Sequence, residues 1–422
     1  MTLPGAKTPF VAIACGGTGG HLFPGLAVAG ELHKRGCQTA LLVSPKDIDQ
    51  QAVKSVRDSE IFTLPAVGLQ NRNYLSFAGS FVKSFFAARK IFRRCRPDAV
   101  LAMGGFTSAP PVLAAERFGA KTFLHESNTI PGRANRFLAR FVDEAFVGFP
   151  ETASRLCARK VTRTGTPVRP RFSAERDPIG PKLQQSRIAL GLEPDCPTIL
   201  IMGGSQGARG INNIILAALP RLQERGQSSR ESRSAAIPAD KRSALQFLHL
   251  TGTNDYEKVK AAYAASGVKA VVKPFLAEMD LALGAATVAV SRAGASSLAE
   301  IAAMRLPSLL VPFPAAADHH QFHNARAFET TGAARLLEQK NAAPEKVAAI
   351  LCELAENEAV RTAMQSALAP WHAPRAAEQI AENILSACRS SSFSLPGEHR
   401  LKPELQPPPH SGEPKQEHVC AA

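Results

Sequence analysis

The chain has few aromatic residues and lacks the long apolar runs and targeting signals of several large protein classes. Phe, Trp and Tyr make up 6% of its 422 residues, and Trp371 is the single tryptophan. No stretch approaches the roughly 20 apolar residues that a membrane-spanning helix needs. The N-terminus lacks the basic region and small-residue cleavage site of a secretory signal. We therefore expect a cytosolic protein.

The eight cysteines lack the spacing of a metal site or of a disulfide framework. They are scattered singly, without a C-x-x-C pair or a His-rich segment to complete a zinc site. We therefore expect buried or incidental thiols.

Length and charge indicate a large, basic protein. A chain of this length is usually divided into two domains, and a hydrophobic content of 45% can supply two cores. The net charge of +14 favours acidic partners, namely nucleic acid, nucleotide phosphates or anionic lipid headgroups. Composition alone does not choose among them.

Short apolar runs alternate with helical patterns, which predicts a doubly wound parallel sheet in each half of the chain. The predicted strands are 10–15, 39–44, 98–105, 121–127 and 144–149, then 198–204, 245–252, 270–275, 287–292 and 307–313. We expect Rossmann-like domains over 1–166 and 167–368, joined by a crossing near 164–172. We also expect a helix over 369–389 that returns to the first domain, a disordered tail over 390–422, and an unstructured surface insertion over 225–244.

A glycine-dense segment follows the first predicted strand of each half, CGGTGGH at 15–21 and GGSQG at 203–207. Glycines between a strand and a helix allow backbone N–H groups to face an anion. Neither segment has the lysine of the Walker A pattern or the spacing of the dinucleotide fingerprint G-x-G-x-x-G. A tight turn without a ligand is the alternative. Because ligands of such sheets bind at the carboxyl ends of the strands, both turns would line one cleft between the halves.

Seven stretches, in order along the chain, resemble the MurG family of peptidoglycan glycosyltransferases. They are GGTGGHLFPGLAVA, MGGFTSAP, LHESN, TGTPVRP, GGSQGARGIN, SRAGASSLAE and DHHQFHNA. The resemblance implies an α/β protein with the GT-B fold, in which two Rossmann-like doubly wound domains face each other across a cleft. It further implies an inverting transferase that moves N-acetylglucosamine from UDP-GlcNAc to the muramoyl 4-hydroxyl of lipid I, giving lipid II for peptidoglycan synthesis.

The resemblance places the nucleotide of the donor in the second half. Glu300 would bind the ribose hydroxyls, since a carboxylate can accept from both, although a surface glutamate near a helix start is the alternative. Arg169 would add positive charge near the phosphates, unless it is a solvated surface group. The remaining positions that match the nucleotide site are Ser205 and Gln206 on the second glycine turn, Ala295 and Ser296 at a helix N-terminus, and Leu276, whose backbone would contact the uracil.

The resemblance also implies positions for the donor sugar. His320 and Gln321 match the pair that holds the sugar hydroxyls, where some relatives carry two glutamines. Asn128 corresponds to a further contact with the donor sugar. Asn324 is a weaker candidate, because it can equally cap a helix.

The first glycine turn, with Thr18, Gly19 and Gly20, would hold the diphosphate of the acceptor lipid. The acceptor hydroxyl must lose a proton during the transfer, and His21 is our candidate base because its ordinary pKa is near neutrality. Glu126 and His125 are the reserve candidates. We expect that donor binding requires no metal or other cofactor.

Residues 74–97 combine Phe77, Phe81, Phe85 and Phe86, at helical spacing, with several Lys and Arg residues. This pattern predicts an interfacial helix attracted to an anionic membrane surface, although one face could simply pack on the sheet. We therefore expect a peripheral protein at the cytoplasmic face of the cell inner membrane. A GT-B transferase with a soluble acceptor is the alternative enzyme. A nucleic-acid-binding module is suggested only by charge, and we expect no nucleic-acid partner, because the basic residues form no recognised binding motif.

Overall fold

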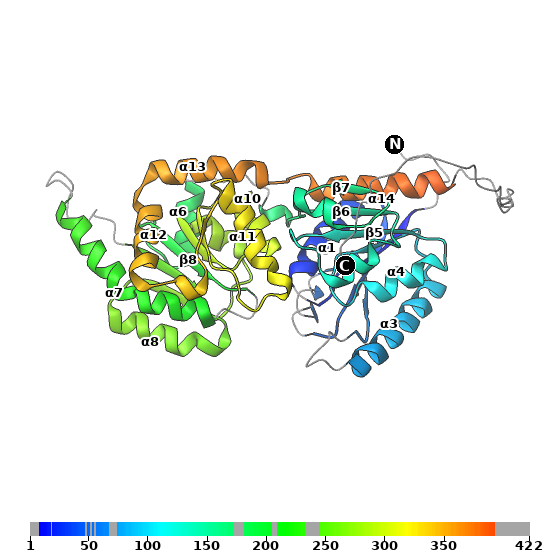
Figure 1. Ribbon diagram of the computed structural model, residues 1–422, viewed down its shortest axis with the longest axis horizontal. Coiled ribbons are helices and arrows are strands. Elements are labelled where there is room, and N and C mark those ends of the chain that lie inside the picture. The colour runs from blue at the N-terminus through cyan, green and yellow to red at the C-terminus, as the bar shows by residue number, and fades with distance from the viewer. Residues whose placement is uncertain are drawn as a thin grey trace, which may run out of the picture.

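The structure is a computed structural model that describes residues 8–17, 19–46, 49–50, 53–54, 56–66, 74–172, 181–204, 209–232 and 245–392. These residues form two lobes side by side, each built on one parallel sheet (Figure 1). We call the lobe that contains β1 to β7 the first lobe and the lobe that contains β8 to β13 the second lobe. The predicted fold class, two doubly wound α/β halves, is confirmed.

The sheet of the first lobe has seven strands in the order β3-β2-β1-β4-β5-β6-β7, and all neighbouring pairs are parallel. The first six follow the strand order of a Rossmann fold. Their bounds are β1 (Phe10–Ala14), β2 (Gln38–Val43), β3 (Glu60–Thr63), β4 (Ala99–Ala102), β5 (Lys121–Glu126), β6 (Glu144–Val147) and β7 (Val161–Arg163).

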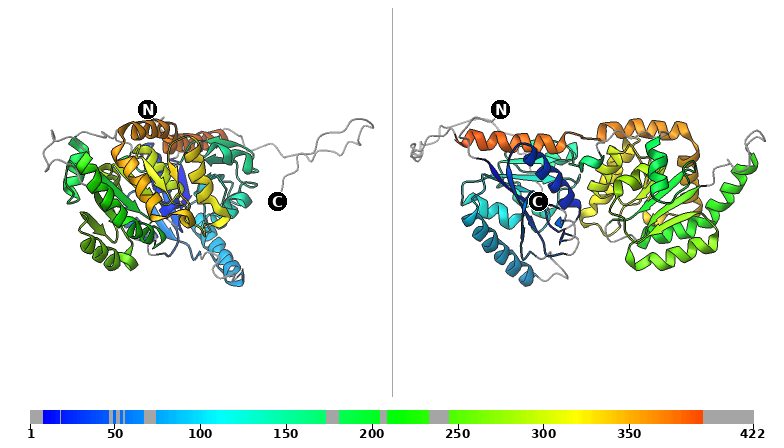
Figure 2. Two further views of the ribbon diagram at one scale, coloured as in Figure 1. Left: turned by 60° about the vertical axis from the view of Figure 1, so that its left-hand side comes forward. Right: turned by 180° about the vertical axis from the view of Figure 1, so that it is seen from behind.

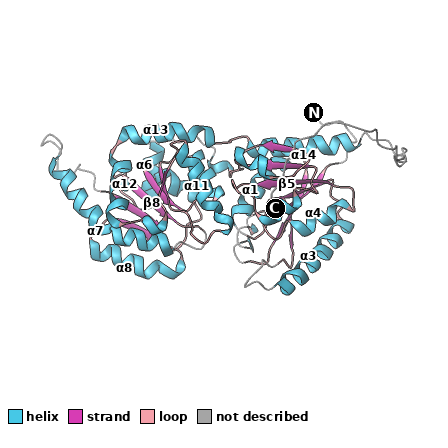
Figure 3. Cartoon of the chain, viewed as in Figure 1, coloured by secondary structure: helices cyan, strands magenta, loops and turns pink. Residues whose placement is uncertain are grey.

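Helices cover both faces of this sheet, which explains why the central strands β1 and β4 are apolar on every residue rather than on alternate ones. One face packs against α1 (Gly19–Lys34) and α14 (Ala376–Ser392). The other face packs against α3 (Tyr74–Arg94), α4 (Ala109–Glu116) and α5 (Arg133–Leu138). Figure 3 shows the helices as layers on either side of the strands.

The second lobe repeats this plan with six parallel strands in the order β10-β9-β8-β11-β12-β13. The strands are β8 (Thr198–Met202), β9 (Gln246–Leu250), β10 (Ala270–Lys273), β11 (Val288–Ser291), β12 (Ser308–Leu310) and β13 (Arg335–Leu336). The helices are α6 (Pro181–Ala189), α7 (Arg209–Ser232), α8 (Tyr256–Ser266), α9 (Met279–Ala285), α10 (Ala295–Ala303), α11 (His320–Thr330), α12 (Pro344–Glu356) and α13 (Glu358–Leu368).

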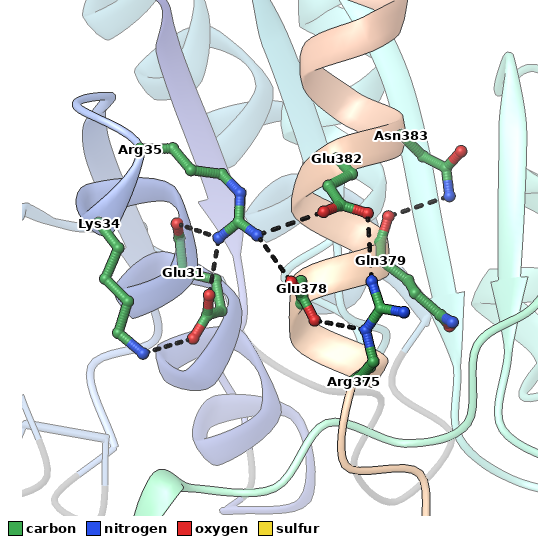
Figure 4. A network of polar contacts seen from close by, with 8 residues as sticks. All are labelled: Glu31, Lys34, Arg35, Arg375, Glu378, Gln379, Glu382 and Asn383. Carbon is green, nitrogen blue, oxygen red and sulfur yellow. Dashed lines mark hydrogen bonds and ion pairs between the residues drawn. The ribbon is translucent and has the colours of Figure 1, made fainter. Parts of the chain in front are cut away.

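The last described helix leaves the second lobe and packs on the first. Figure 2 shows α14 lying along the first lobe after α13 has run along the second. Ile380 and Ile384 of α14 are completely buried in the core that α1 also joins. Arg35, directly after α1, contacts both Glu378 and Glu382 of α14, at 3.4 and 3.5 Å (Figure 4). Apolar packing and a charged rim therefore fasten the end of the described chain to its beginning.

The chain crosses between the lobes at two neighbouring places. A Cβ atom at Gly165, which has a φ of +80°, would collide with Ala373 of the returning segment. Phe172 is completely buried in the core of the second lobe. Trp371 stacks on Phe328 with ring centroids 4.4 Å apart. The two crossings therefore lie in contact, each next to aromatic side chains of the second lobe.

The structure differs from the sequence prediction mainly at the periphery. Three short strands at or near the sheet edges, β3, β7 and β13, were not predicted, because they are at least partly exposed and lack a continuous apolar run. The expectation of an unstructured insertion over 225–244 is wrong for 225–232, since α7 continues to Ser232, and residues 233–244 lie outside the described part. Helix propagation costs little once a long helix has formed, so a polar extension can remain helical.

Candidate active site at the boundary between the lobes

The carboxyl ends of strands from both sheets meet at the boundary between the lobes, and polar contacts cross it at several places. Ser296 Oγ donates to the Gly20 carbonyl at 3.0 Å. The Thr129 N–H donates to Asn324 Oδ1 at 2.9 Å. Arg136 contacts Asp318 at 2.8 Å. The loops that the sequence assigned to one cleft are therefore close together.

Hydrogen bonds with two side chains fix the backbone of the first glycine turn. Asp49 Oδ2 accepts the N–H of Gly17 at 2.6 Å, and Thr107 Oγ1 donates to the Gly16 carbonyl at 2.7 Å. Gly17 has a φ of +113°, and a Cβ at Gly16 would collide with the backbone of β2, so the turn requires glycine at both positions. The Gly17 N–H is thus already used, while Gly19 and Gly20 begin α1. Thr18 lies outside the described residues.

Lys46, which the sequence analysis did not select, stands beside this turn. Its Nζ donates to the Gly17 carbonyl at 3.0 Å and lies 5.1 Å from the centre of the Phe106 ring. Lys46 is exposed, so it supplies a solvent-accessible positive charge at the first glycine turn. Its position shortly after β2, at the carboxyl edge of the sheet, is the signal that could have identified it.

His21 is half-buried against the loop that follows β4. Its Nδ1 lies 2.9 Å from the Met103 carbonyl. A carbonyl can only accept, so the neutral ring carries its proton on Nδ1 and keeps a lone pair on Nε2. Gly104 and Gly105 make room for the ring, since a Cβ at Gly104 would lie 2.9 Å from His21 Cε1.

Burial and nearby charges act on the pKa of His21 in opposite directions. Burial lowers the pKa of His21 below its usual value, while the charges of Glu126 and Asp49 and the Met103 carbonyl act in the opposite direction. His320, from the second lobe, also lowers the pKa of His21. The pKa of His21 therefore depends on a residue from the opposite lobe.

Glu126, one of the two reserve bases, is a buried carboxylate whose oxygens both accept hydrogen bonds. Oε1 accepts from the backbone N–H and the side-chain amide of Asn128, at 2.8 and 3.0 Å. Oε2 accepts from the Gly132 N–H at 2.9 Å and from Asn135 Nδ2 at 2.8 Å. These bonds fix the loop between β5 and α5, so the geometry gives Glu126 a positioning role. Neither Asn135 nor this network had a recognisable signal in the sequence.

Asn324 is completely buried in α11 and uses both ends of its amide. Its Oδ1 accepts from the N–H and the hydroxyl of Thr129, each at 2.9 Å. Its Nδ2 donates to Asn128 Oδ1 at 3.0 Å and to the Ala293 carbonyl at 3.1 Å. Asn324 therefore ties the β5 loop of the first lobe to α11 and to the loop before α10.

The N-terminus of α10 contacts α1 through a carbonyl that a proline leaves unpaired. Pro24 lies inside α1, where it has no N–H to donate to the carbonyl four residues earlier, that of Gly20. The Ser296 hydroxyl donates to this carbonyl. Ala295 is buried in the first turn of α10. The other predicted diphosphate positions, Ser205 and Gln206, lie outside the described residues.

Arg169 and Glu300, predicted for the phosphates and the ribose, form an ion pair of 3.2 Å. The side chain of Glu300 is 13% exposed and that of Arg169 23%. Burial raises the pKa of Glu300, and the charge and hydrogen bond of Arg169 lower it. Both groups are thus poorly solvated and depend on each other for charge compensation.

Three of the residues predicted for the sugar and the uracil lie in a loop and at a helix start of the second lobe. His320 Nδ1 lies 2.8 Å from the Ala317 carbonyl, which fixes the proton on Nδ1 and leaves Nε2 as an acceptor. Gln321 Oε1 accepts the Phe313 N–H at 3.0 Å. Asp318 and His319, directly before them, both have left-handed backbone, with φ of 49° and 51°. Leu276 is half-buried in the loop after β10.

In the ranges that the structure describes, no three or more His, Cys, Asp and Glu side chains are grouped so as to hold a metal ion.

Helix α3 has one face in the core and one in solvent. Ala88 and Phe92 are completely buried against the sheet. Leu75, Val82 and Phe86 are 89%, 51% and 57% exposed. No described helix is both long enough and apolar enough to span a bilayer. Packing of one face on the sheet is confirmed, and it includes Phe81 and Phe85. Contact of the exposed face with a membrane stays a prediction.

Comparisons with known proteins agree with this architecture. Residues 11–147 match the glycosyltransferase family 28 N-terminal domain, and residues 198–382 match the C-terminal domain of that family. The chain is 34% identical to a UDP-N-acetylglucosamine--N-acetylmuramyl-(pentapeptide) pyrophosphoryl-undecaprenol N-acetylglucosamine transferase of Anaeromyxobacter sp., over 92% of this chain and 96% of that one. It is 36% identical to a transferase of the same name from Syntrophus aciditrophicus, over 80% and 87%.

A solved structure shares the arrangement of both lobes. The crystal structure of Acinetobacter baumannii MurG superimposes with a TM-score of 0.66 and 26% identity, covering 90% of this chain and 100% of that one. The similarity therefore extends over both sheets and the boundary between them.

Proposed function

Because the chain belongs to glycosyltransferase family 28, we propose that it transfers N-acetylglucosamine from UDP-GlcNAc to lipid I and so forms lipid II. The main support is the similarity, over most of the chain, to transferases named for this reaction. The site supports the proposal, because a histidine with a free Nε2 on the first lobe lies near residues suited to a nucleotide sugar on the second.

We assign proton transfer to His21. The 4-hydroxyl of the acceptor would donate to Nε2 and lose its proton as its oxygen attacks the anomeric carbon. The bond from that carbon to the UDP oxygen breaks on the opposite face, so the configuration inverts. Asp49 and Glu126 would stabilise the positive charge that His21 acquires, since both carboxylates raise its pKa.

The donor would lie along the second lobe. The backbone N–H groups at the start of α10, near Ala295 and Ser296, would meet the diphosphate together with Arg169. Glu300 would accept from the ribose hydroxyls. The remaining assignments are the backbone of Leu276 for the uracil, Ser205 and Gln206 for the phosphates, and His320, Gln321 and Asn128 for the sugar.

We propose that this site neutralises the diphosphate without a metal ion. Arg169 and the amide dipoles of α10 would supply the positive charge that a divalent cation supplies elsewhere. UDP affinity measured by isothermal titration should be the same in EDTA and in magnesium. A loss of more than about tenfold in EDTA would show that a metal takes part.

The acceptor would reach the first lobe from a membrane surface. The first glycine turn, with the N–H groups of Gly19 and Gly20 and the Lys46 charge, is suited to the acceptor diphosphate. The exposed face of α3 would touch the lipid, with its basic residues on anionic headgroups. This arrangement is that of a peripheral protein at the cytoplasmic face of the inner membrane, without a nucleic-acid partner.

Transfer of radiolabel from UDP-GlcNAc to a lipid I analogue tests the proposal. We expect labelled product with the lipid analogue and much slower transfer to the same muramoyl peptide without its lipid. Efficient use of the soluble acceptor would favour the alternative, a GT-B transferase with a soluble substrate. No transfer by folded protein that binds UDP would contradict the lipid I reaction.

A further inference from the structure

In this structure Arg169 already binds the carboxylate of Glu300, to which the ribose of the donor would bind. Arg169 Nη2 lies 3.2 Å from Glu300 Oε1, and the two residues are 131 positions apart in the sequence. Glu300 is largely shielded from water. A ribose hydroxyl that donates to Oε1 must therefore compete with the guanidinium.

Two aromatic rings lie against the guanidinium of Arg169. Its centre lies 4.4 Å from the Phe23 ring of α1 and 5.0 Å from the Phe172 ring of the second core. Arg169 Nε is buried and has no hydrogen-bond partner. A planar cation held in this way can exchange the partner at its edge without leaving its place.

We propose that Arg169 and Glu300 form an exchangeable ion pair that makes recognition of the nucleoside depend on the diphosphate. This inference rests on the proposed function. The ribose binds Glu300 only when the donor diphosphate binds Arg169. Each charged side chain thereby exchanges its partner in the ion pair for a group of the donor.

The physical basis is the cost of leaving a shielded charge unpaired. Separating a poorly solvated ion pair by removing one partner is costly, because the other charge remains without compensation. Uridine alone would separate the pair and leave Arg169 without an anion. Pyrophosphate alone would separate it and leave Glu300 without a donor. UDP replaces both interactions at once, so its two parts bind cooperatively.

Binding of the two fragments to variants of the pair tests this exchange. We would measure the dissociation constants of uridine, pyrophosphate and UDP, by titration calorimetry or ligand-observed NMR, for wild type, Arg169→Gln and Glu300→Gln. Glu300→Gln frees Arg169, so pyrophosphate should bind about three- to tenfold more tightly than to wild type. Arg169→Gln frees Glu300, so uridine should bind as well or better, while UDP binds at least tenfold more weakly.

Arg171→Gln is the matched control, because Arg171 is an exposed arginine two residues away with no place in the pair. It should leave all three constants within twofold of wild type. Pyrophosphate binding that is unchanged or weaker in Glu300→Gln would overturn the proposal, and this arm decides alone if Arg169→Gln does not fold.

The transfer assay separates this inference from the proposed function. If wild type transfers the sugar but the dissociation constants of uridine and pyrophosphate do not change in the two variants, the exchange alone is contradicted. Wild type that binds UDP but transfers nothing to lipid I contradicts the proposed reaction and leaves the exchange to be judged by the binding data.

Discussion

The two lobes have the same strand order but use the carboxyl edge of the sheet in different ways. In the first lobe, side chains form the functional part of this edge. Asp49 and Thr107 fix the glycine turn, and His21 lies beside it with a free ring nitrogen. In the second lobe, the corresponding part of the edge is the N-terminus of α10, together with the ion pair of Arg169 and Glu300. One topology thus provides an edge suited to proton transfer and another suited to binding an anion.

The difference follows from what each task requires. Proton transfer needs a side chain whose pKa the surroundings can adjust, and the buried carboxylates near His21 provide that adjustment. Binding a diphosphate needs a fixed array of donors, which backbone N–H groups and an arginine supply without titrating near neutrality. Four variants and one pH profile test this division, from the largest expected effect to the smallest.

His21→Ala should affect the chemical step and spare the second lobe. We expect kcat to fall by about 10²- to 10⁴-fold, the usual range for a general base, while the dissociation constant of UDP stays within twofold. Turnover and calorimetry on the same preparation measure both. Turnover close to that of wild type would remove His21 as the base.

The pH profile of the wild type gives a second measure of His21. A base must be deprotonated, and burial lowers the pKa of His21 below its usual value of about 6.5. The rate kcat/KM should therefore be constant around pH 7 and decline only at pH values below 6.5. His21→Ala should lose this acidic limb.

Two acidic substitutions on α3 test whether the first lobe, and not the second, binds membranes. Leu75→Asp with Phe86→Asp should reduce binding to anionic vesicles at least tenfold, since each side chain contributes about 1.5–3 kcal/mol when fully buried. The control is Ile188→Asp, because Ile188 is 63% exposed on α6 of the second lobe. Flotation measures binding, and an equal loss in both variants would contradict a membrane role confined to the first lobe.

Lys46→Ala tests the charge beside the first glycine turn. We expect the KM for a lipid I analogue to rise about two- to fivefold, as for an exposed ion pair of up to 1 kcal/mol, with the KM for UDP-GlcNAc unchanged. Lys182→Ala, an exposed lysine of the second lobe, is the control. A change confined to the donor KM would assign Lys46 to the other substrate.

Pro24→Ala tests the contact that joins the two edges. An alanine N–H can pair with the Gly20 carbonyl inside α1 and compete with Ser296. We expect kcat to fall about twofold while the melting temperature stays level or rises, because proline inside a helix is unfavourable by about 3 kcal/mol. Ser296→Ala should give a similar kcat, and full activity in both variants would show that this contact is dispensable.

Sequence reasoning worked best where local pattern and local structure coincide. All ten predicted strands occur, because most of them are buried on both faces and are therefore largely apolar runs. The strands that were missed, β3, β7 and β13, are short and partly exposed, so their pattern is weak. Within the site, glycines and helix starts were visible in the sequence, whereas Lys46, Asp49 and Asn135 were not selected, because no local pattern marks their contacts.

The sequence by itself determined the two series of strand, turn and helix, since apolar runs and glycines act over a few neighbouring residues. Only the tertiary structure decided that Glu126 accepts four hydrogen bonds, that Asn324 joins the lobes, and that Arg169 meets Glu300. These contacts depend on how whole sheets and helices pack, because the free energy of a buried polar group is set by partners that are distant in the chain.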